Sequence, residues 1–292
     1  MPTIDPSIAL RPQASPDAWL LVLLLGGGYL YLLSAWGPTS APTHLRRRGY
    51  ATRQQKILYF TGVLVFGIGA SSPIHNVGEN YLYSFHMVQH LMFQLVAAPL
   101  LILGTPAWML RRMLVRPKVL PVVTVITKPL VALLLVNAFV ATAHTPQFVE
   151  ATLSNGLFHL FTHFLWVAVG LLMWWPVTSP LPEVPHYSYL GRMGYLFSHS
   201  ILPTVPASFL TFASAPLYSS YENAPRIWEF ITPLVDLQIA GLLMKIGGGL
   251  LLWAVIAALF FRWSHEDRTG GPDALYWRDF AGTDQTPELV KR

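Results

Sequence analysis

Long apolar runs are the feature that most limits how this chain can fold. A membrane-spanning helix needs about 20 mostly apolar residues, because each residue advances about 1.5 Å across about 30 Å of hydrocarbon. Charged residues make up 11% of the 292 residues and hydrophobic residues 53%, whereas soluble proteins carry about 25% charged residues. We therefore predict an all-α integral membrane protein, a bundle of seven transmembrane helices. The candidate spans are residues 18–36, 56–72, 82–104, 120–143, 155–176, 190–213 and 234–262.

Lysine and arginine residues predict how this bundle is oriented. With seven spans, the basic connectors 37–55 and 105–119 and the basic tail after residue 261 all lie on one side, and the other side has Arg11 and Arg226. The positive-inside rule then places the N-terminus outside and the C-terminus in the cytoplasm. The predicted organisation is an extracytoplasmic segment 1–17, a seven-helix transmembrane domain 18–262 and a cytoplasmic tail 263–292.

The sequence contains no cysteine, which excludes disulfides and thiolate metal sites. Any metal would have to be bound by histidine, methionine, carboxylate or backbone oxygen. The net charge of +5 does not indicate a nucleic-acid partner, because the basic residues lie in loops beside apolar spans. The sequence also lacks GxSxG and P-loop motifs, so we do not predict an enzyme.

Two histidine pairs form the strongest candidate site. His86 and His90 lie near the outer start of the third span, and His159 and His163 lie near the outer start of the fifth. Each pair has i, i+4 spacing, so both rings of a pair face the same way, one helical turn apart. The helical rise places the first histidine of each pair about 6–8 Å below the membrane boundary and the second about 12–14 Å below it. We predict that these four imidazoles come to one level.

A transition-metal site is the interpretation we favour for these pairs. Ionisable residues inside a membrane are costly and usually functional, and imidazole binds copper, zinc, iron and nickel. Asp236 opens the last span at the same face, and Met87 and Met92 lie close to the first pair. Histidine and methionine without cysteine suit copper. The alternative is that the histidines only form hydrogen bonds between helices.

Other polar residues near the apolar runs have more than one interpretation. His144 ends the fourth span and His75 precedes the third, both at the outer face, where the roles of metal ligand and of interface residue are equally open. We favour helix–helix hydrogen bonding for His199, in the middle of the sixth span. Lys245, in the middle of the seventh span, is interpreted as a lysine paired with a carbonyl or a carboxylate.

Several segments also carry a resemblance to a known family. They are residues 72–75, 84–91, 97–106, 144–146, 159–163, 174–176 and 236–249. These segments resemble the CtaG-like cytochrome c oxidase assembly factors of bacterial plasma membranes, and the resemblance covers roughly residues 55–262. The His-Met-x-Gln-His motif at 86–90 is more specific than the block at 236–249.

This resemblance implies a role in assembling a haem–copper oxidase rather than oxidase activity itself. It implies a metallochaperone-like, multi-pass protein of the bacterial plasma membrane that binds copper at the outer-face histidine cluster. The copper would be inserted into the copper–haem centre of the oxidase catalytic subunit, and a soluble extracytoplasmic donor would supply it. By position, the residues implied to bind or pass copper are His75, His86, His90, His144, His159, His163 and Asp236.

Three other functions stay open on the sequence alone. A haem-binding membrane redox protein would use histidines as axial ligands, normally one from each of two facing helices rather than two from one helix. A copper transporter would need a polar path through the membrane, which His199 and Lys245 would have to continue inward. A purely structural membrane partner would use the histidines only to connect helices.

Overall fold

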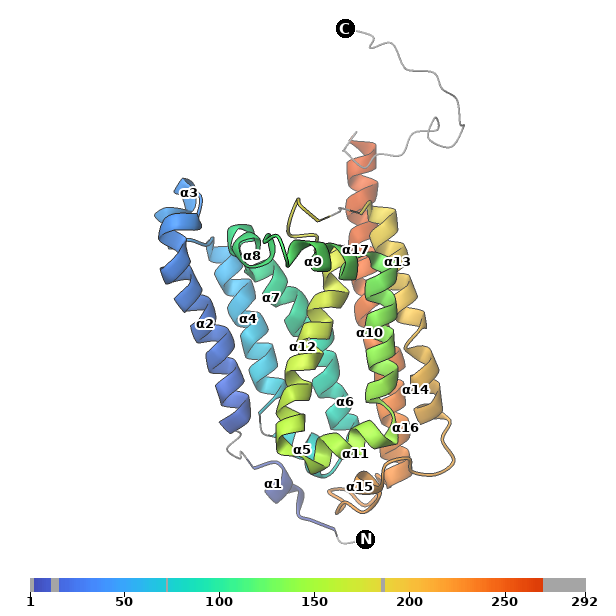
Figure 1. Ribbon diagram of the computed structural model, residues 1–292. Coiled ribbons are helices and arrows are strands. Elements are labelled where there is room, and N and C mark those ends of the chain that lie inside the picture. The colour runs from blue at the N-terminus through green and yellow to red at the C-terminus, as the bar shows by residue number, and fades with distance from the viewer. Residues whose placement is uncertain (1–2, 12–15, 72, 185–186, 270–292) are drawn as a thin grey trace, which may run out of the picture.

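The chain folds into a bundle of helices with two distinct ends (Figure 1). A computed structural model describes residues 3–11, 16–71, 73–184 and 187–269, and the predicted tail beyond residue 269 lies outside these ranges. Within them every regular element is helical, apart from a single parallel bridge between Thr3 and Arg226.

The short helices mark the two ends of the bundle (Figure 1). One end, here the α8 end, carries α3 (Thr43–Arg46), α8 (Ala107–Leu114) and α9 (Leu120–Ile126). The opposite end, here the α5 end, carries α1 (Pro6–Ala9), α5 (Ile74–Asn80), α11 (Pro146–Ser154) and α15 (Ser219–Glu222).

Four helices in the described ranges are long and apolar enough to cross a membrane, and the number rises to six if each of two bent pairs is one span. The four are α2 (Pro16–Ser40), the run α6–η1–α7 (Tyr83–Leu91, Met92–Ala97, Ala98–Gly104), α12 (Gly156–Thr178) and the run α16–η2–α17 (Pro233–Leu242, Leu243–Gly247, Gly248–Arg268). The segments η1 and η2 are π-helical turns within otherwise α-helical runs. The protein is therefore an all-helical membrane protein, as predicted, and the count of seven spans and the orientation stay predictions.

Proline residues interrupt two regions where the sequence predicts a single span. Within 120–143, α9 and α10 (Pro129–Ala143) meet at an angle of 76°. Lys128 has an extended backbone with ψ 135°, because the ring of a proline disfavours the helical conformation at the preceding residue. Residues 190–213 form α13 (Tyr189–Ile201) and α14 (Thr204–Thr211) instead of one helix. Pro203 between them has no N–H to donate to the fourth carbonyl before it.

The chain also bends by 42° between α4 (Arg53–Gly69) and α5. A capping box fixes where α4 begins: the Gln55 amide donates to Thr52 Oγ1, and the Thr52 amide donates to the Gln55 side chain. The predicted span over 56–72 ends at residue 72, which lies outside the described ranges. His75, predicted in a loop, lies in the short helix α5.

Glycines allow α4 and α12 to pack closely against the run α6–η1–α7. A Cβ atom added at Gly170 of α12 would lie 2.7 Å from the Ala98 Cβ and 3.0 Å from the Gln94 Cα. At Gly62 of α4, an added Cβ would lie 3.1 Å from the Ala97 carbonyl oxygen. Small residues permit this close approach of membrane helices. As a result, the helix that carries His86 and His90 lies in the interior of the bundle.

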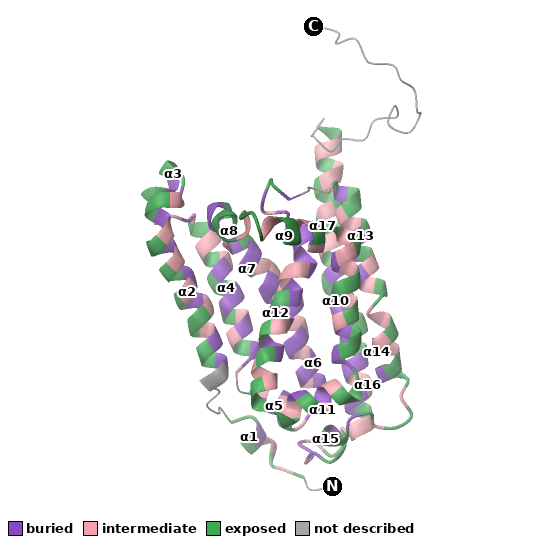
Figure 2. Cartoon of the chain, viewed as in Figure 1, coloured by how far each residue is buried: buried purple, intermediate pink, exposed green. Residues whose placement is uncertain are grey.

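Exposure separates the interior helices from those at the edge of the bundle (Figure 2). Buried residues follow α6, α7 and α12, whereas α2 exposes Leu23 at 68% and Tyr31 at 68%. Large apolar side chains that face outward suit lipid rather than water.

Hydrogen bonds tie the segments at the α5 end to one another. Asn76 donates to the Ala9 carbonyl (2.7 Å), and the Tyr221 hydroxyl donates to the Gly78 carbonyl (2.7 Å). The Tyr218 hydroxyl donates to the His144 carbonyl (2.9 Å). These contacts fix α5 over the ends of the long helices, where two of its side chains join the site described next.

Candidate metal centre

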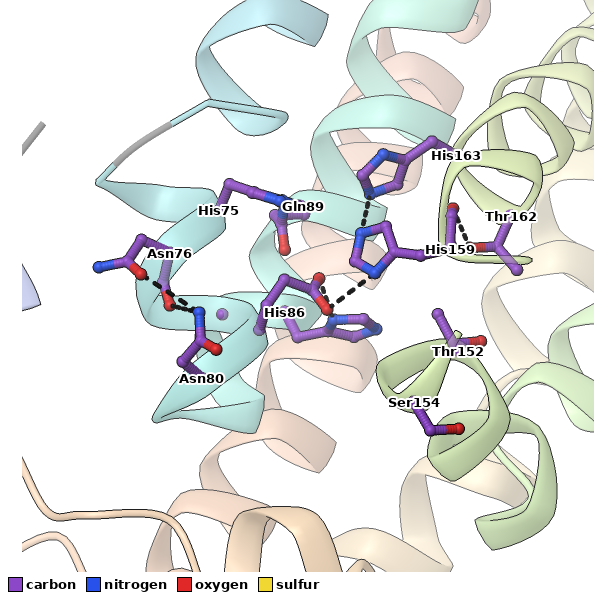
Figure 3. Close-up of polar contacts among 12 residues, drawn as sticks. His75, Asn76, Asn80, His86, Gln89, Thr152, Ser154, His159, Thr162 and His163 are labelled. Carbon is purple, nitrogen blue, oxygen red and sulfur yellow. Dashed lines mark hydrogen bonds and ion pairs between the residues drawn. The ribbon is translucent and has the colours of Figure 1, made fainter. Parts of the chain in front are cut away.

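Four side chains from two helices converge at the α5 end (Figure 3). His75 and Glu79 come from α5, and His159 and His163 come from α12. One ligand atom from each residue lies within 4.8 Å of the others, and this group is called the tetrad. Both pairs have i, i+4 spacing, which directs two side chains of one helix to the same face. The tetrad therefore needs only the contact of one face of α5 with one face of α12.

The tetrad is compact. His159 Nε2 lies 3.2 Å from His163 Nε2, and His159 Nδ1 lies 3.4 Å from Glu79 Oε2. The His75 ring packs edge-on against both other rings, with centroids at 5.3 Å from His159 and 5.5 Å from His163. The start of α12 is fixed by Asn155, whose side chain accepts a hydrogen bond from the Phe158 amide (3.0 Å).

The donor atoms suit a transition-metal ion. Three imidazoles and one carboxylate form a four-ligand set of the kind that binds zinc or copper. Glu79 is nearly buried, with 9% of its side chain exposed, and its charge would offset part of the charge of a cation. The buried His163 Nδ1 has no hydrogen-bond partner among the described residues. The buried Glu79 Oε2, which faces His159 Nδ1, also lacks a hydrogen-bond partner among the described residues, and buried polar atoms are costly to leave unpaired.

Two further side chains hold the tetrad in place. His86 Nδ1 lies 2.9 Å from Glu79 Oε1, so His86 contacts one carboxylate oxygen and His159 contacts the other. Gln89 Nε2 donates to the Gly69 carbonyl (2.8 Å) and lies 3.1 Å from His75 Nδ1. Supporting contacts of this kind orient metal ligands and tune their affinity.

His90 and His144 lie deeper in the bundle than the tetrad does. The His86 and His90 rings pack at 4.3 Å, and His90 stacks on Trp166 at 3.9 Å. His144 is the C-cap residue of α10, and its ring centroid is 6.3 Å from that of His90. The histidines therefore form a chain of rings from the tetrad toward the middle of the bundle.

Residues 30–266 match the protein family described as cytochrome c oxidase caa3 assembly factor (Caa3_CtaG). The chain belongs to this assembly-factor family. The predicted resemblance is thus confirmed over most of the chain.

Two mycobacterial proteins are similar to this family member. They are Uncharacterized protein Mb0105 of Mycobacterium bovis and Uncharacterized protein MT0111 of Mycobacterium tuberculosis. Each is 25% identical over 287 residues, which cover 86% of this chain and 40% of the relative. The chain therefore spans less than half the length of these relatives. No solved structure matches it.

Asp236, one of the residues implied to bind copper in the assembly factor, lies against backbone amides. Its two carboxylate oxygens accept hydrogen bonds from the amides of Tyr83 (2.6 Å) and Ser84 (3.1 Å). These amides open the first turn of α6, which has no capping side chain of its own. Asp236 thus caps a helix from a neighbouring one and is not part of the tetrad. Its role as a ligand stays a prediction.

In the structure of the assembly factor, the histidines are grouped differently from the two pairs that the sequence predicted to share one site. His159 and His163 lie together as expected, but their partners are His75 and Glu79 rather than His86 and His90. Sequence reasoning missed Glu79 as a candidate ligand. The sequence feature that could have identified Glu79 is its i, i+4 spacing from His75.

Proposed function

We propose that this protein binds copper at the tetrad and delivers it to the catalytic subunit of a haem–copper oxidase. The observation that supports this most directly is the convergence of three imidazoles and a carboxylate within 4.8 Å in a member of an oxidase assembly family. Copper is the cargo of the protein, and no catalytic step is assigned to it.

The chemistry of the ligands favours copper over other divalent ions. Among first-row divalent metals, sites of nitrogen and oxygen ligands generally bind Cu²⁺ most tightly. The chain has no cysteine that would favour a thiolate zinc or iron–sulfur site. Imidazole and carboxylate ligands exchange without breaking a thiolate bond, which suits an ion that must be passed on.

The position of the tetrad favours delivery from outside the cell. Arginines gather at the α8 end, with Arg46 in α3 and Arg111 and Arg112 in α8, whereas the tetrad lies at the α5 end (Figure 1). By the positive-inside rule the α8 end faces the cytoplasm, and the α5 end faces the extracytoplasmic side. The tetrad lies close to that surface, where His159 keeps 12% of its side chain exposed, which favours loading by a soluble copper donor on that side.

A haem-binding function fits the site less well. A haem iron already has four porphyrin nitrogens and takes only axial ligands from the protein. Four protein donor groups that converge on one point leave no room for the porphyrin. The cavity beyond His90 measures about 50 Å³, whereas pockets for larger organic ligands enclose roughly 300–1,000 Å³. A single metal ion suits both spaces.

The decisive experiment measures copper bound per chain in purified protein. The variant His159→Ala with His163→Ala removes both α12 ligands, and His44→Ala, an exposed histidine in α3, is the matched control. We expect one tightly bound Cu²⁺ at the tetrad in the wild type and in the control, and none at that affinity in the double variant. Unchanged copper content in the folded double variant would refute the assignment, and a strong Soret band in the visible spectrum would favour haem.

A further inference from the structure

A separate cavity lies beyond His90, farther into the bundle than the tetrad, and is called the inner cavity. Its volume is about 50 Å³, and its polar lining comes from His90, Gln94, Asn137, His144, His199, Ser200, Thr204 and Lys245. On this measure, about 10–15 Å³ is enough to hold one water molecule. The inner cavity therefore has room for an ion or for a few waters, and no described carboxylate lines it.

His144 presents a free lone pair to the inner cavity. Its Nδ1 lies 2.6 Å from the Val140 carbonyl oxygen, and a carbonyl can only accept, so the proton must be on Nδ1. The other nitrogen, Nε2, then has a lone pair, and it has no hydrogen-bond partner among the described residues. The residue is 8% exposed. A histidine that donates through one nitrogen to a carbonyl and leaves the other free has the arrangement of a metal ligand.

Three methionines also line the inner cavity. They are Met87, Met173 and Met244, and all three are buried. Thioether sulfur is a soft ligand that favours Cu(I) over hard ions and over most divalent ions. The tetrad contains no sulfur, so the two sites differ in the class of ion that they suit.

Both π-helical turns of the bundle border the inner cavity. Gln94 and Leu95 of η1 and Met244 and Lys245 of η2 are among its lining residues. An isolated π-turn in an α-helix is frequently found at a functional site. A π-turn on each of two helices at this cavity is therefore a separate observation in favour of a functional site, in addition to the histidines and methionines.

Lys245 is among the residues that line the inner cavity, although its side chain is exposed. No described residue pairs with its ammonium group. The Coulomb repulsion that a cation meets from this charge is twice as large for a divalent ion as for a monovalent one. The lysine therefore favours a monovalent occupant.

We infer that the inner cavity is a second metal site, which binds a soft monovalent cation such as Cu(I) through His144 and the methionine thioethers. This inference does not depend on copper binding at the tetrad.

The first test uses the full chain in detergent, with Ag(I) as a soft monovalent probe that does not change oxidation state. In the variant His159→Ala with His163→Ala, the tetrad has lost two ligands, so a remaining tight site is the inner cavity. We expect this variant to retain one Ag(I) per chain and to bind no Cu(II) tightly. Loss of the Ag(I) from the folded variant, or equal filling by Cu(II), would overturn the inference. If copper binding at the wild-type tetrad fails while Ag(I) still binds, only the proposed function is refuted.

The second test removes sulfur at nearly constant volume. We add Met87→Leu and Met244→Leu to the same variant, and the exposed Met113→Leu serves as the control, because such exchanges conserve side-chain volume. Loss of these ligands should weaken Ag(I) binding by about tenfold or more. With Cu(I), X-ray absorption should show sulfur next to the metal before the exchange, and without cysteine in the chain that sulfur must be methionine. Unchanged affinity, or an initial spectrum without sulfur, would contradict the inference.

Discussion

The tetrad and the inner cavity are both lined by histidine, yet they offer an ion different surroundings. The tetrad combines imidazole with the Glu79 carboxylate at the α5 end, and three of its four residues are partly exposed. The inner cavity combines imidazole with thioether groups and is bordered by a lysine instead of a carboxylate, and its histidines and methionines are buried. The difference shows that a histidine's function is set by the groups that the neighbouring helices bring to it, not by its spacing alone.

Removing the carboxylate should give the largest difference between the two sites. Glu79→Gln keeps the shape of the side chain but removes the negative charge, so we expect Cu(II) affinity at the tetrad to fall on the order of 100-fold. Ag(I) affinity in the inner cavity should stay the same. A competition titration against a chelator measures both, with the exposed Glu222→Gln as control. An equal loss at both sites would mean that Glu79 supports the fold and not one site.

Acid should separate the sites next. Metal binds the neutral imidazole, so protonation competes with binding, and affinity falls as the pH drops through the ordinary histidine value of about 6.5. Thioethers do not protonate in this range. Between pH 7.5 and 5.5 we expect Cu(II) affinity at the tetrad to fall, and Ag(I) affinity to fall less. A titration series in one detergent gives the two slopes, and parallel slopes would contradict the assignment of thioether ligands.

Neutralising Lys245 should strengthen only the inner cavity. Lys245→Met removes the repulsion, which is weakened because the lysine side chain is exposed. Ag(I) affinity should therefore rise by roughly two- to threefold, while Cu(II) affinity at the tetrad does not change. Lys128→Met, at an exposed position between α9 and α10, is the matched control. A fall in Ag(I) affinity would indicate that Lys245 positions the site instead of opposing the ion.

Asp236→Asn should have the smallest effect on either site. The amide side chain has one acceptor oxygen where the carboxylate uses two for the amides of Tyr83 and Ser84. One buried amide then loses its partner, at a cost of about 1–3 kcal/mol in the free energy of unfolding. Thermal unfolding should show the loss, with metal affinities close to wild type. The reverse result, normal stability with copper binding lost, would make Asp236 a ligand.

The helices of this fold were largely predictable, because length and apolarity decide what can cross a membrane. The runs 82–104 and 155–176 correspond closely to Tyr83–Gly104 and Gly156–Thr178. Counting apolar residues did not reveal the 76° turn at Lys128 and Pro129, although the proline was visible in the sequence. The pattern of apolar residues did not distinguish the π-helical turns from ordinary α-helix.

The candidate site was predictable only in part. The i, i+4 spacing placed His159 and His163 on one face of a helix, but it could not say which helix that face meets. The contact between α5 and α12 joins residues about 80 positions apart in the chain and results from tertiary packing. His75 and Glu79 become candidate ligands only through that contact, which explains why Glu79 was missed.

The division of the tetrad between α5 and α12 has a consequence for newly made protein. Each helix supplies half of the ligands, so neither half binds an ion tightly before the two helices meet. Under the proposed function, an unfinished or misfolded chain then cannot withdraw copper from its surroundings, and tight binding would report that folding is complete. The protein would acquire its cargo only when it is competent to hand that cargo on.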